Sequence, residues 1–276
     1  MKKMLLALIT STLLLVGCGS NNKTALNEKN QFIVGMECGY APFNWQTSLK
    51  SDYTVSLGGA GYADGYDVLI AKKIADSLGK ELVIKKISWD GLILALDSGE
   101  IDAVIAGMTA NEAREEGADF TTPYYDSKGM IMIVRKNSEE AKFKNIQQFT
   151  GKKVIGQKGT NYDEVIDQIK GVWHVTPKST YPEMVVALQQ GDVDGITAEI
   201  AVAEGILAAH DDLTVVEFDK GKGFKADTTV SIALKEGTRN SEFFQSVQDA
   251  LDKISTDERK QMMQEAVERQ SLGNEK

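Results

Sequence analysis

The sequence predicts an α/β protein built from two lobes of similar design. Short apolar runs typical of buried strands alternate with stretches whose apolar residues recur with helical spacing. This alternation is typical of an α/β fold with parallel strands. In addition, residues 91–107 align without a gap with residues 183–199, so one helix-turn-strand unit occurs twice. We therefore expect each lobe to be a sheet flanked by helices, although two unrelated units with the same caps could also align in this way.

The N-terminus has the features of an export signal. Two lysines precede an apolar run, Met4 to Val16, which is too short to span a bilayer but has the length of a signal-peptide core. The residues up to Cys18 resemble a bacterial lipobox, in which the cysteine is acylated, for example with palmitate, and becomes the first mature residue. We therefore expect a lipoprotein signal peptide at 1–17. An ordinary cleaved signal or a membrane helix is the alternative.

The segment after the signal peptide predicts where the protein is held. The polar residues 18–30 predict a flexible tether, so the protein is expected on the extracytoplasmic face of the cell membrane, anchored there by lipid at Cys18.

Charge and cysteine content restrict the possible partners. The formal net charge is -9 and the chain has no basic stripe, which argues against nucleic acid as a partner. Only two cysteines occur, so acylation of Cys18 leaves Cys38 without a disulfide partner.

The first half of the chain predicts strands and helices in alternation. Ile70, Ile74 and Leu78 are four residues apart and precede Gly79, which indicates an amphipathic helix that ends at a glycine. Residues 46–65 are rich in glycine and poor in apolar anchors, which predicts a surface insertion. In order, we expect a strand at 32–36, a helix from 66 to 78, a strand at 82–87, a helix at 92–96 and a strand at 103–106.

The second half predicts a similar order of elements. Gly159 and Thr160 would begin a helix, where free backbone amides and the helix dipole favour a negative group. The last three elements are expected to return to the first lobe. We expect strands at 130–134 and 154–157, a helix at 162–169, the repeated unit at 183–199, a strand at 228–234, and helices at 242–254 and 257–270.

A group of donors suited to an anion follows the strand at 103–106. Gly107 allows a ligand to approach the backbone, Thr109 adds a hydroxyl, and Arg114 offers a planar fork that matches a carboxylate. Taken alone, this pattern also fits a strand-turn-helix with a solvated arginine. The second repeat ends at Glu199, in the position that Gly107 occupies in the first. If the repeats belong to two lobes, opposite charges could face each other across a cleft.

Several motifs together resemble those of the type-3 extracellular solute-binding proteins, the polar amino-acid receptors of ABC importers. The resemblance runs from about Phe32 to the C-terminal helices. It implies a periplasmic-binding-protein-like fold in which two crossover strands, near 127–130 and 228–230, join the lobes. The implied lobes are 31–128 plus 230–276 and 129–229. The motifs are Gly39-Tyr40-Ala41-Pro42-Phe43, Gly65-Tyr66-Asp67-Val68, Trp89-Asp90-Gly91-Leu92, Gly99 to Gly107, Asp119-Phe120-Thr121, Pro123-Tyr124-Tyr125 and Gly159-Thr160.

The resemblance also assigns roles in binding the two charged groups of a free amino acid. Arg114 matches the family arginine that binds the α-carboxylate, with Thr109 and the backbone of Gly107 beside it. Glu199 stands where relatives usually have the aspartate that receives the α-ammonium, so its extra methylene shifts the charge. In the second lobe, Thr160 or Asn161 matches a further donor to the carboxylate, and Gln157 matches a neighbouring contact.

The ligand side chain is expected to contact an acid and two aromatic residues. Tyr40 and Trp89 match family positions that form apolar or aromatic walls, and Glu37 matches one where an acid often contacts the ligand side chain. This combination suits a cationic group through charge and cation-π contacts, so arginine or lysine is slightly favoured over glutamine or another polar amino acid. Alternatively, the aromatic residues belong to the core and Glu37 is solvated.

The expected function is capture of an L-amino acid by lobe closure and its delivery to an ABC transporter permease. We expect a monomer with no cofactor and no metal ion. The alternatives are a dehydratase-like enzyme on the same two-lobed scaffold, or a ligand-sensing domain. His174 and His210 lie near no nucleophile in the sequence, no metal-ligand spacing occurs, and Asp102 and Asp194 sit at equivalent strand starts, which suggests capping rather than catalysis.

Overall fold

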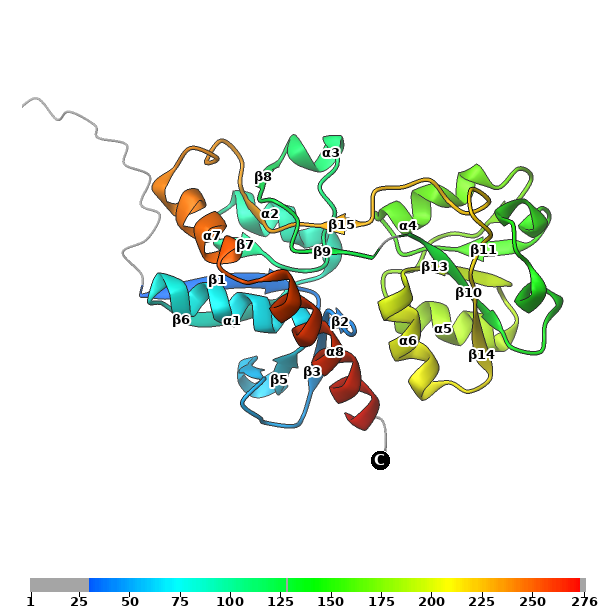
Figure 1. Ribbon diagram of the computed structural model, residues 1–276, viewed down its shortest axis with the longest axis horizontal. Coiled ribbons are helices and arrows are strands. Elements are labelled where there is room, and N and C mark those ends of the chain that lie inside the picture. Colours follow the sequence, from blue (N-terminus) through cyan, green and yellow to red (C-terminus); the bar gives the residue numbers. More distant parts are fainter. Residues whose placement is uncertain (1–29, 128, 274–276) are drawn as a thin grey trace, which may run out of the picture.

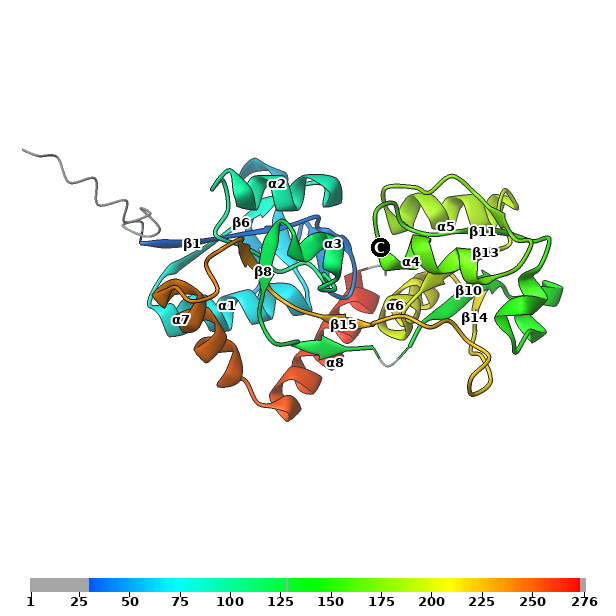
Figure 2. The same cartoon turned by 90° about the horizontal axis from the view of Figure 1, so that it is seen from above.

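The computed structural model describes residues 30–127 and 129–273. The predicted signal peptide, the acylated Cys18 and the tether up to residue 29 lie outside these residues. Figure 1 shows two lobes, each with a central sheet and flanking helices, and Figure 2 shows the same division from above. The expected two-lobed α/β fold is therefore confirmed.

The first sheet combines strands from both ends of the chain. Its order is β6-β1-β7-β16-β8. β1 runs parallel to β6 and β7, whereas β16 runs antiparallel to β7 and β8. The expectation of parallel strands therefore holds for only part of this sheet, because β16 enters it from the opposite lobe. The strands are β1 (Gln31–Met36), β6 (Glu81–Lys86), β7 (Ala103–Val104), β8 (Ala118–Phe120) and β16 (Ala233–Lys235).

The second sheet has the order β12-β11-β13-β10-β14. β11 is parallel to β12 and β13, and β10 is antiparallel to β13 and β14. This sheet is therefore also mixed, with a parallel half that corresponds to the parallel half of the first sheet. The strands are β10 (Ile131–Arg135), β11 (Lys153–Ile155), β12 (Trp173–His174), β13 (Gly195–Ala198) and β14 (Leu213–Val216).

Two short antiparallel strands run between the lobes. They are β9 (Tyr125–Asp126) and β15 (Thr229–Val230). The single strand expected at 228–234 is thus two strands, since β15 pairs with β9 and β16 then joins the first sheet. At the break, the Ser231 amide donates to the Met108 carbonyl at 2.8 Å. Figure 1 draws both strands between the lobes, and the lobe boundaries at 31–128 plus 230–276 and 129–229 stay a prediction.

The glycine-rich insertion is more regular than its composition suggests. It contributes to a four-stranded antiparallel sheet in the order β2-β3-β5-β4. The segment is largely exposed and leads into α1 (Tyr66–Leu78), as expected of a surface insertion, and its short strands were not predicted because strands that pair locally leave no long apolar pattern in the sequence. The strands are β2 (Gly39–Tyr40), β3 (Asn44–Thr47), β4 (Val55–Ser56) and β5 (Tyr62–Asp64).

The helices largely follow the predicted pattern. The helix expected before Gly79 is present, and Gly79 adopts the left-handed conformation that ends it. The helix expected at 162–169 is only one α-helical turn, followed by a 3-10 segment at Val165–Gln168. The α-helices are α1 (Tyr66–Leu78), α2 (Leu92–Asp97), α3 (Glu112–Glu115), α4 (Asn161–Glu164), α5 (Tyr181–Gln190), α6 (Ile200–Ala209), α7 (Glu242–Asp252) and α8 (Thr256–Gly273).

The sequence repeat is also a structural repeat. The carboxylate of Asp102, before β7, accepts a hydrogen bond from the Ile33 amide at 2.8 Å. The carboxylate of Asp194, before β13, accepts one from the Lys153 amide at 2.9 Å. Each aspartate thus joins the start of its own strand to the parallel strand beside it, β1 in the first lobe and β11 in the second, which confirms the capping role. Asp194 also forms an ion pair with Arg135 at 3.1 Å.

Truncation of these aspartates should reduce stability without affecting the cleft between the lobes. We expect Asp102→Ala to lower the free energy of unfolding by about 1–2 kcal/mol, since a partly buried amide loses its acceptor. Asp194→Ala should cost more, because Arg135 also loses a partner. Urea denaturation of the protein without its signal peptide measures both values. Equal stability of wild type and both variants would contradict the capping role.

Candidate functional site

Strands β1 and β11, one from each lobe, bring a carboxylate and an amide together beyond their carboxyl ends. Glu37 follows β1, and Gln157 follows β11 by two residues. The side-chain amide of Gln157 donates to Glu37 Oε2 at 2.9 Å, across the boundary between the lobes. It also donates to the Ser179 carbonyl at 3.0 Å. Both side chains are buried, so this contact fixes one end of the cleft.

Glu37 is a buried acid with unused hydrogen-bonding capacity. Glu37 is only 8% exposed, and this burial raises the pKa of its carboxyl to about 7. The hydrogen bond from Gln157 and the charge of Lys86 oppose this rise in pKa only in part. Among the described residues, Glu37 Oε1 has no hydrogen-bond partner. The site therefore holds a carboxylate oxygen that can accept a hydrogen bond from a ligand.

Glu199 is a second such acid, at the opposite side of the cleft. It directly follows β13 and is 0% exposed. The hydroxyls of Tyr40, from the first lobe, and Tyr162, from the second, both donate to its Oε1, the latter at 3.0 Å. Its Oε2 has no partner among the residues that the structure describes. Burial raises the pKa of the Glu199 carboxyl to about 7, against the lowering effect of the two hydroxyls.

Arg114 provides a positive charge at the lobe boundary. It lies on α3, where the Asn111 side chain caps the helix by accepting from the Arg114 amide at 2.9 Å. Its guanidinium donates to the Thr109 carbonyl at 2.6 Å and, across the lobes, to the Gly159 carbonyl at 3.0 Å. The guanidinium lies over the Trp89 ring, 5.1 Å from its centroid. Burial lowers the pKa of Arg114, which marks it as a desolvated cation at the lobe boundary.

Gly107 packs against the ring of Tyr40. Its φ of 64° is left-handed, and a Cβ built there would lie 2.8 Å from a carbon of the Tyr40 ring. A side chain at this position would therefore disturb the tyrosine that contacts Glu199. The Gly107 amide is engaged by protein, since it donates to the Tyr124 hydroxyl at 3.0 Å.

The remaining predicted residues divide into two groups. Thr109 and Thr160 are buried near the lobe boundary, and the Thr160 hydroxyl donates to the Gln157 carbonyl at 2.7 Å. Asn161 instead lines a separate groove, where its side chain contacts Asn111 and the Asp227 carbonyl, each at 3.3 Å. Its side chain is thus turned away from the two buried acids, whereas the other predicted positions gather around the cleft.

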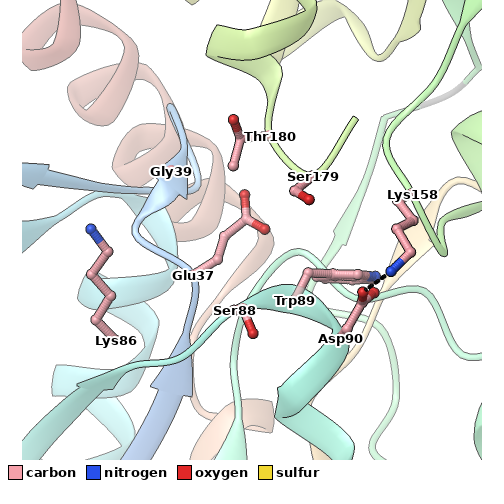
Figure 3. A pocket seen from close by; sticks show the side chains of 9 residues that line it. All are labelled: Glu37, Gly39, Lys86, Ser88, Trp89, Asp90, Lys158, Ser179 and Thr180. Carbon is pink, nitrogen blue, oxygen red and sulfur yellow. Dashed lines mark hydrogen bonds and ion pairs between the residues drawn. The ribbon is translucent and has the colours of Figure 1, made fainter. Parts of the chain in front are cut away.

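A cavity of about 400 Å³ opens beside Glu37, between the lobes. Figure 3 shows the Glu37 carboxyl pointing into it and the flat Trp89 ring forming one wall. Across its mouth, Lys158 forms an ion pair with Asp90 at 2.5 Å. A few precisely placed polar groups in a concave site are typical of small-molecule recognition. The cavity is lined by Glu37, Gly39, Lys86, Ser88, Trp89, Asp90, Lys158, Ser179 and Thr180.

Sequence reasoning missed several residues of this site. Tyr162, whose hydroxyl donates to Glu199, directly follows the predicted pair Thr160 and Asn161. An aromatic residue at the start of a helix predicts a core position, so no role in binding was expected for it. Tyr124 lies in the quoted motif Pro123-Tyr124-Tyr125, without a role assigned there. Lys86, at the end of β6, also lines the cavity. Its ammonium donates to the side-chain oxygen of Gln46 at 2.6 Å.

The sequence-family model of the bacterial extracellular solute-binding proteins, family 3, matches residues 32–267 of this chain. The chain belongs to this family. A probable histidine-binding protein of Campylobacter jejuni is 34% identical to this solute-binding protein over 234 residues, 81% of this chain and 85% of the relative. The L-cystine-binding protein TcyJ of Escherichia coli is 31% identical, over 84% of this chain and 80% of its own. The predicted resemblance is therefore confirmed.

A solved structure shows the same fold. The amino acid ABC transporter substrate-binding protein AbpA of Streptococcus pneumoniae, bound to L-arginine, superposes with a TM-score of 0.75 at 24% identity, covering 88% of this solute-binding protein and 96% of AbpA. Within 30–127 and 129–273, no helix is long and apolar enough to cross a membrane, and no cluster of His, Cys, Asp or Glu is arranged for a metal ion. His174 instead lies between Asp163 and Asp167, 2.8 Å from each.

The two buried acids predict how the stability of this solute-binding protein depends on pH. The pKa of each carboxyl is raised from 4.5 to about 7 by folding. The folded state thus binds more protons than the unfolded state between these values, so the free energy of unfolding falls as pH rises through this window. The stabilisation is fully present below pH 4.5 and lost above about 7.

Replacing one acid with its neutral amide should remove part of this pH dependence. At pH 8, without added amino acid, we expect Glu37→Gln to be more stable than wild type, by roughly 1–3 kcal/mol. At pH 4.5 the two proteins should be equally stable, because the wild-type carboxyl is then protonated. Urea unfolding at both pH values measures this difference. A difference that does not change with pH would contradict a raised pKa for Glu37.

Proposed function

We propose that this protein is an extracytoplasmic solute-binding lipoprotein that captures an L-amino acid by lobe closure and delivers it to an ABC transporter permease. The observation that carries the proposal is that Arg114, on the first lobe, donates across the lobe boundary, while Glu199, on the second, accepts across it and keeps one oxygen without a partner among the described residues. A free amino acid presents a carboxylate and an ammonium on one carbon, so its receptor needs fixed donors opposite a fixed anion. These two residues supply both.

The main-chain groups of the amino acid are assigned to the two sides of the cleft. The α-carboxylate would accept from the Arg114 guanidinium, with Thr109, Gly107 and Thr160 beside it. The α-ammonium would donate to Glu199 Oε2, which has no partner among the described residues. A charged hydrogen bond contributes about 1.5–3 kcal/mol, so a few of them suffice to hold a small ligand. Asn161 is the weakest of the proposed contacts, since its side chain lies in another groove.

The side-chain pocket favours a basic amino acid, arginine or lysine, over glutamine. In the cavity, Lys158 pairs with Asp90 and Lys86 donates to Gln46, whereas Glu37 Oε1 has no partner among the described residues. A cationic side chain would donate to that oxygen, with Trp89 as the aromatic wall. Two relatives are named as a histidine-binding and an L-cystine-binding protein, and both of these amino acids also carry polar side chains. The proposal therefore names basic or polar amino acids as the ligand class.

The membrane anchor and the oligomeric state belong to the same proposal. The lipobox at Cys18 would hold the protein at the outer face of the membrane, and a single chain carries both halves of the site, so a monomer suffices. The family and its relatives are substrate-binding proteins, and we propose a binding role here rather than a catalytic one. Closure between the lobes would remove water from the ligand's charges and strengthen each contact.

Loss of the arginine should abolish binding while the protein remains folded. We expect Arg114→Ala to weaken the tightest-binding amino acid by about a hundredfold or more, because two charged hydrogen bonds are lost. Calorimetric titration with the twenty common amino acids measures this loss, and the absence of binding to all of them by wild type would reject the proposed function. Arg239→Ala is the matched control, since Arg239 pairs with Asp119 within the first lobe. Unchanged affinity in Arg114→Ala would show that the carboxylate binds elsewhere.

Glu37 should determine the choice of side chain rather than the strength of main-chain binding. We expect Glu37→Gln to weaken arginine by about tenfold and to change glutamine affinity by less than about threefold, since only the cation loses its charged partner. Competition between the two amino acids for wild type and variant measures the ratio. An equal loss for both would show that Glu37 does not contact the ligand side chain.

A further inference from the structure

One fully buried carboxylate outside the cleft connects to both ligand-facing loops of the first lobe. Asp67 lies in the first turn of α1 and is 0% exposed. Its Oδ1 accepts from the Tyr124 hydroxyl at 2.7 Å, and its Oδ2 accepts from the Asn44 side-chain amide at 2.8 Å. Neither of these hydrogen bonds comes from a predicted ligand contact. Its hydrogen bonds nevertheless continue towards the cleft along two routes.

The first route leads to Gly107. The Tyr124 hydroxyl donates to Asp67 and accepts from the Gly107 amide at 3.0 Å. Because a hydroxyl has one proton, donation to the carboxylate leaves its lone pairs to face the amide. Gly107 is left-handed, with a φ of 64°, and packs against the ring of Tyr40. This route thus holds the backbone beside the tyrosine that contacts Glu199.

The second route leads to Glu37. The Asn44 side chain donates its amide protons to Asp67, and its Oδ1 accepts from the Cys38 amide at 2.8 Å. Cys38 has a φ of 54°, the only left-handed value for a residue other than glycine among the described residues. This conformation is unfavourable for a side chain with a Cβ and persists only where neighbouring contacts enforce it. Cys38 directly follows Glu37, so this route holds the backbone next to that acid.

We propose that Asp67 is a positioning residue, which holds Gly107 through Tyr124 and Cys38 through Asn44, and thereby fixes the backbone beside Tyr40 and beside Glu37 for amino-acid binding. The inference rests on the proposed function, and it adds a role for a residue that never meets the ligand. The two routes share only the carboxylate, so each can be broken separately. Tyr124 and Asn44 are therefore predicted to affect different parts of the ligand.

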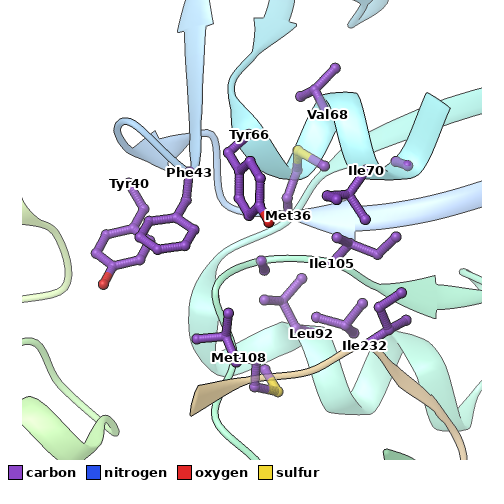
Figure 4. Packing of buried hydrophobic residues seen from close by; sticks show 14 of the residues in the cluster. Met36, Tyr40, Phe43, Tyr66, Val68, Ile70, Leu92, Ile105, Met108 and Ile232 are labelled. Carbon is purple, nitrogen blue, oxygen red and sulfur yellow. The ribbon is translucent and has the colours of Figure 1, made fainter. Parts of the chain in front are cut away.

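The neighbouring Tyr66 provides a matched control. It is fully buried, and its hydroxyl donates to the Tyr124 carbonyl at 2.9 Å, but it belongs to neither route. Figure 4 shows Tyr66 in the same core as Phe43 and Tyr40. Tyr66→Phe therefore removes one buried hydrogen bond from the same region. A purely structural role for the Asp67 network would make this control and the route variants behave alike.

The test compares Tyr124→Phe, Asn44→Leu, Asp67→Asn and the control Tyr66→Phe. Amide hydrogen exchange, followed by NMR, should accelerate at Gly107 alone in Tyr124→Phe, at Cys38 alone in Asn44→Leu, and at one or both in Asp67→Asn. Calorimetry with arginine and glutamine should show a loss of about tenfold for both amino acids in Tyr124→Phe, and a larger loss for arginine than for glutamine in Asn44→Leu. Tyr66→Phe should keep both affinities within about twofold, even where urea unfolding shows reduced stability.

Each outcome supports or overturns the positioning role of Asp67. Wild-type exchange rates at Gly107 and Cys38 in all route variants would overturn the positioning role, whatever the protein binds. Faster exchange together with unchanged affinities would overturn its importance for binding. If Asn44→Leu does not fold, Tyr124→Phe against Tyr66→Phe still decides, because both remove only a hydroxyl. A wild-type protein that binds neither arginine nor glutamine, nor any other common amino acid, would reject the proposed function while the exchange measurements still test the network.

Discussion

The burial of Glu199 is the constraint on which the organisation of the cleft depends. Removing a carboxylate from water costs several kcal/mol unless hydrogen bonds or an opposite charge compensate it. Here Tyr40 and Tyr162, one from each lobe, donate to a single oxygen, and within the described part of the chain the other oxygen has no partner. The compensation is therefore incomplete and spans the lobe boundary. An ammonium group placed against the second oxygen would complete it, which couples ligand binding to contact between the lobes.

The duplicated unit explains why opposite groups meet at this boundary. Asp102 and Asp194 fasten equivalent strands in the two sheets, so the ends of those strands are held in equivalent places. Two lobes that face each other then present their equivalent ends to one another. Glu37 and Gln157 end such a pair of strands and share a hydrogen bond. The same scaffold thus carries different side chains in each copy, and the chemistry of the site arises from those differences.

The parts of the structure that could be predicted are those with a local signal. Helix α1 has its apolar spacing and a terminal glycine, and the aspartates of the repeat precede short apolar strands. The contacts of Glu199 had no such signal, because Tyr40 lies far from it in the sequence. Asn161 was adjacent to the correct helix start, but sequence position does not fix which way a side chain turns. The break between β15 and β16 was hidden for a related reason: residues 228–234 contain no glycine or proline, and only the change of pairing partner divides them into two strands.

The central claim is that one amino acid binds through both of its main-chain charges, the carboxylate to the first lobe and the ammonium to the second. The most direct test is calorimetric titration with the tightest-binding amino acid and with the amine made by removing its α-carboxylate. The amine keeps the side chain and the ammonium, so it loses only the contacts to Arg114 and its neighbours. We expect it to bind about a hundredfold more weakly than the amino acid, or not at all. Equal affinity for the two compounds would contradict the account.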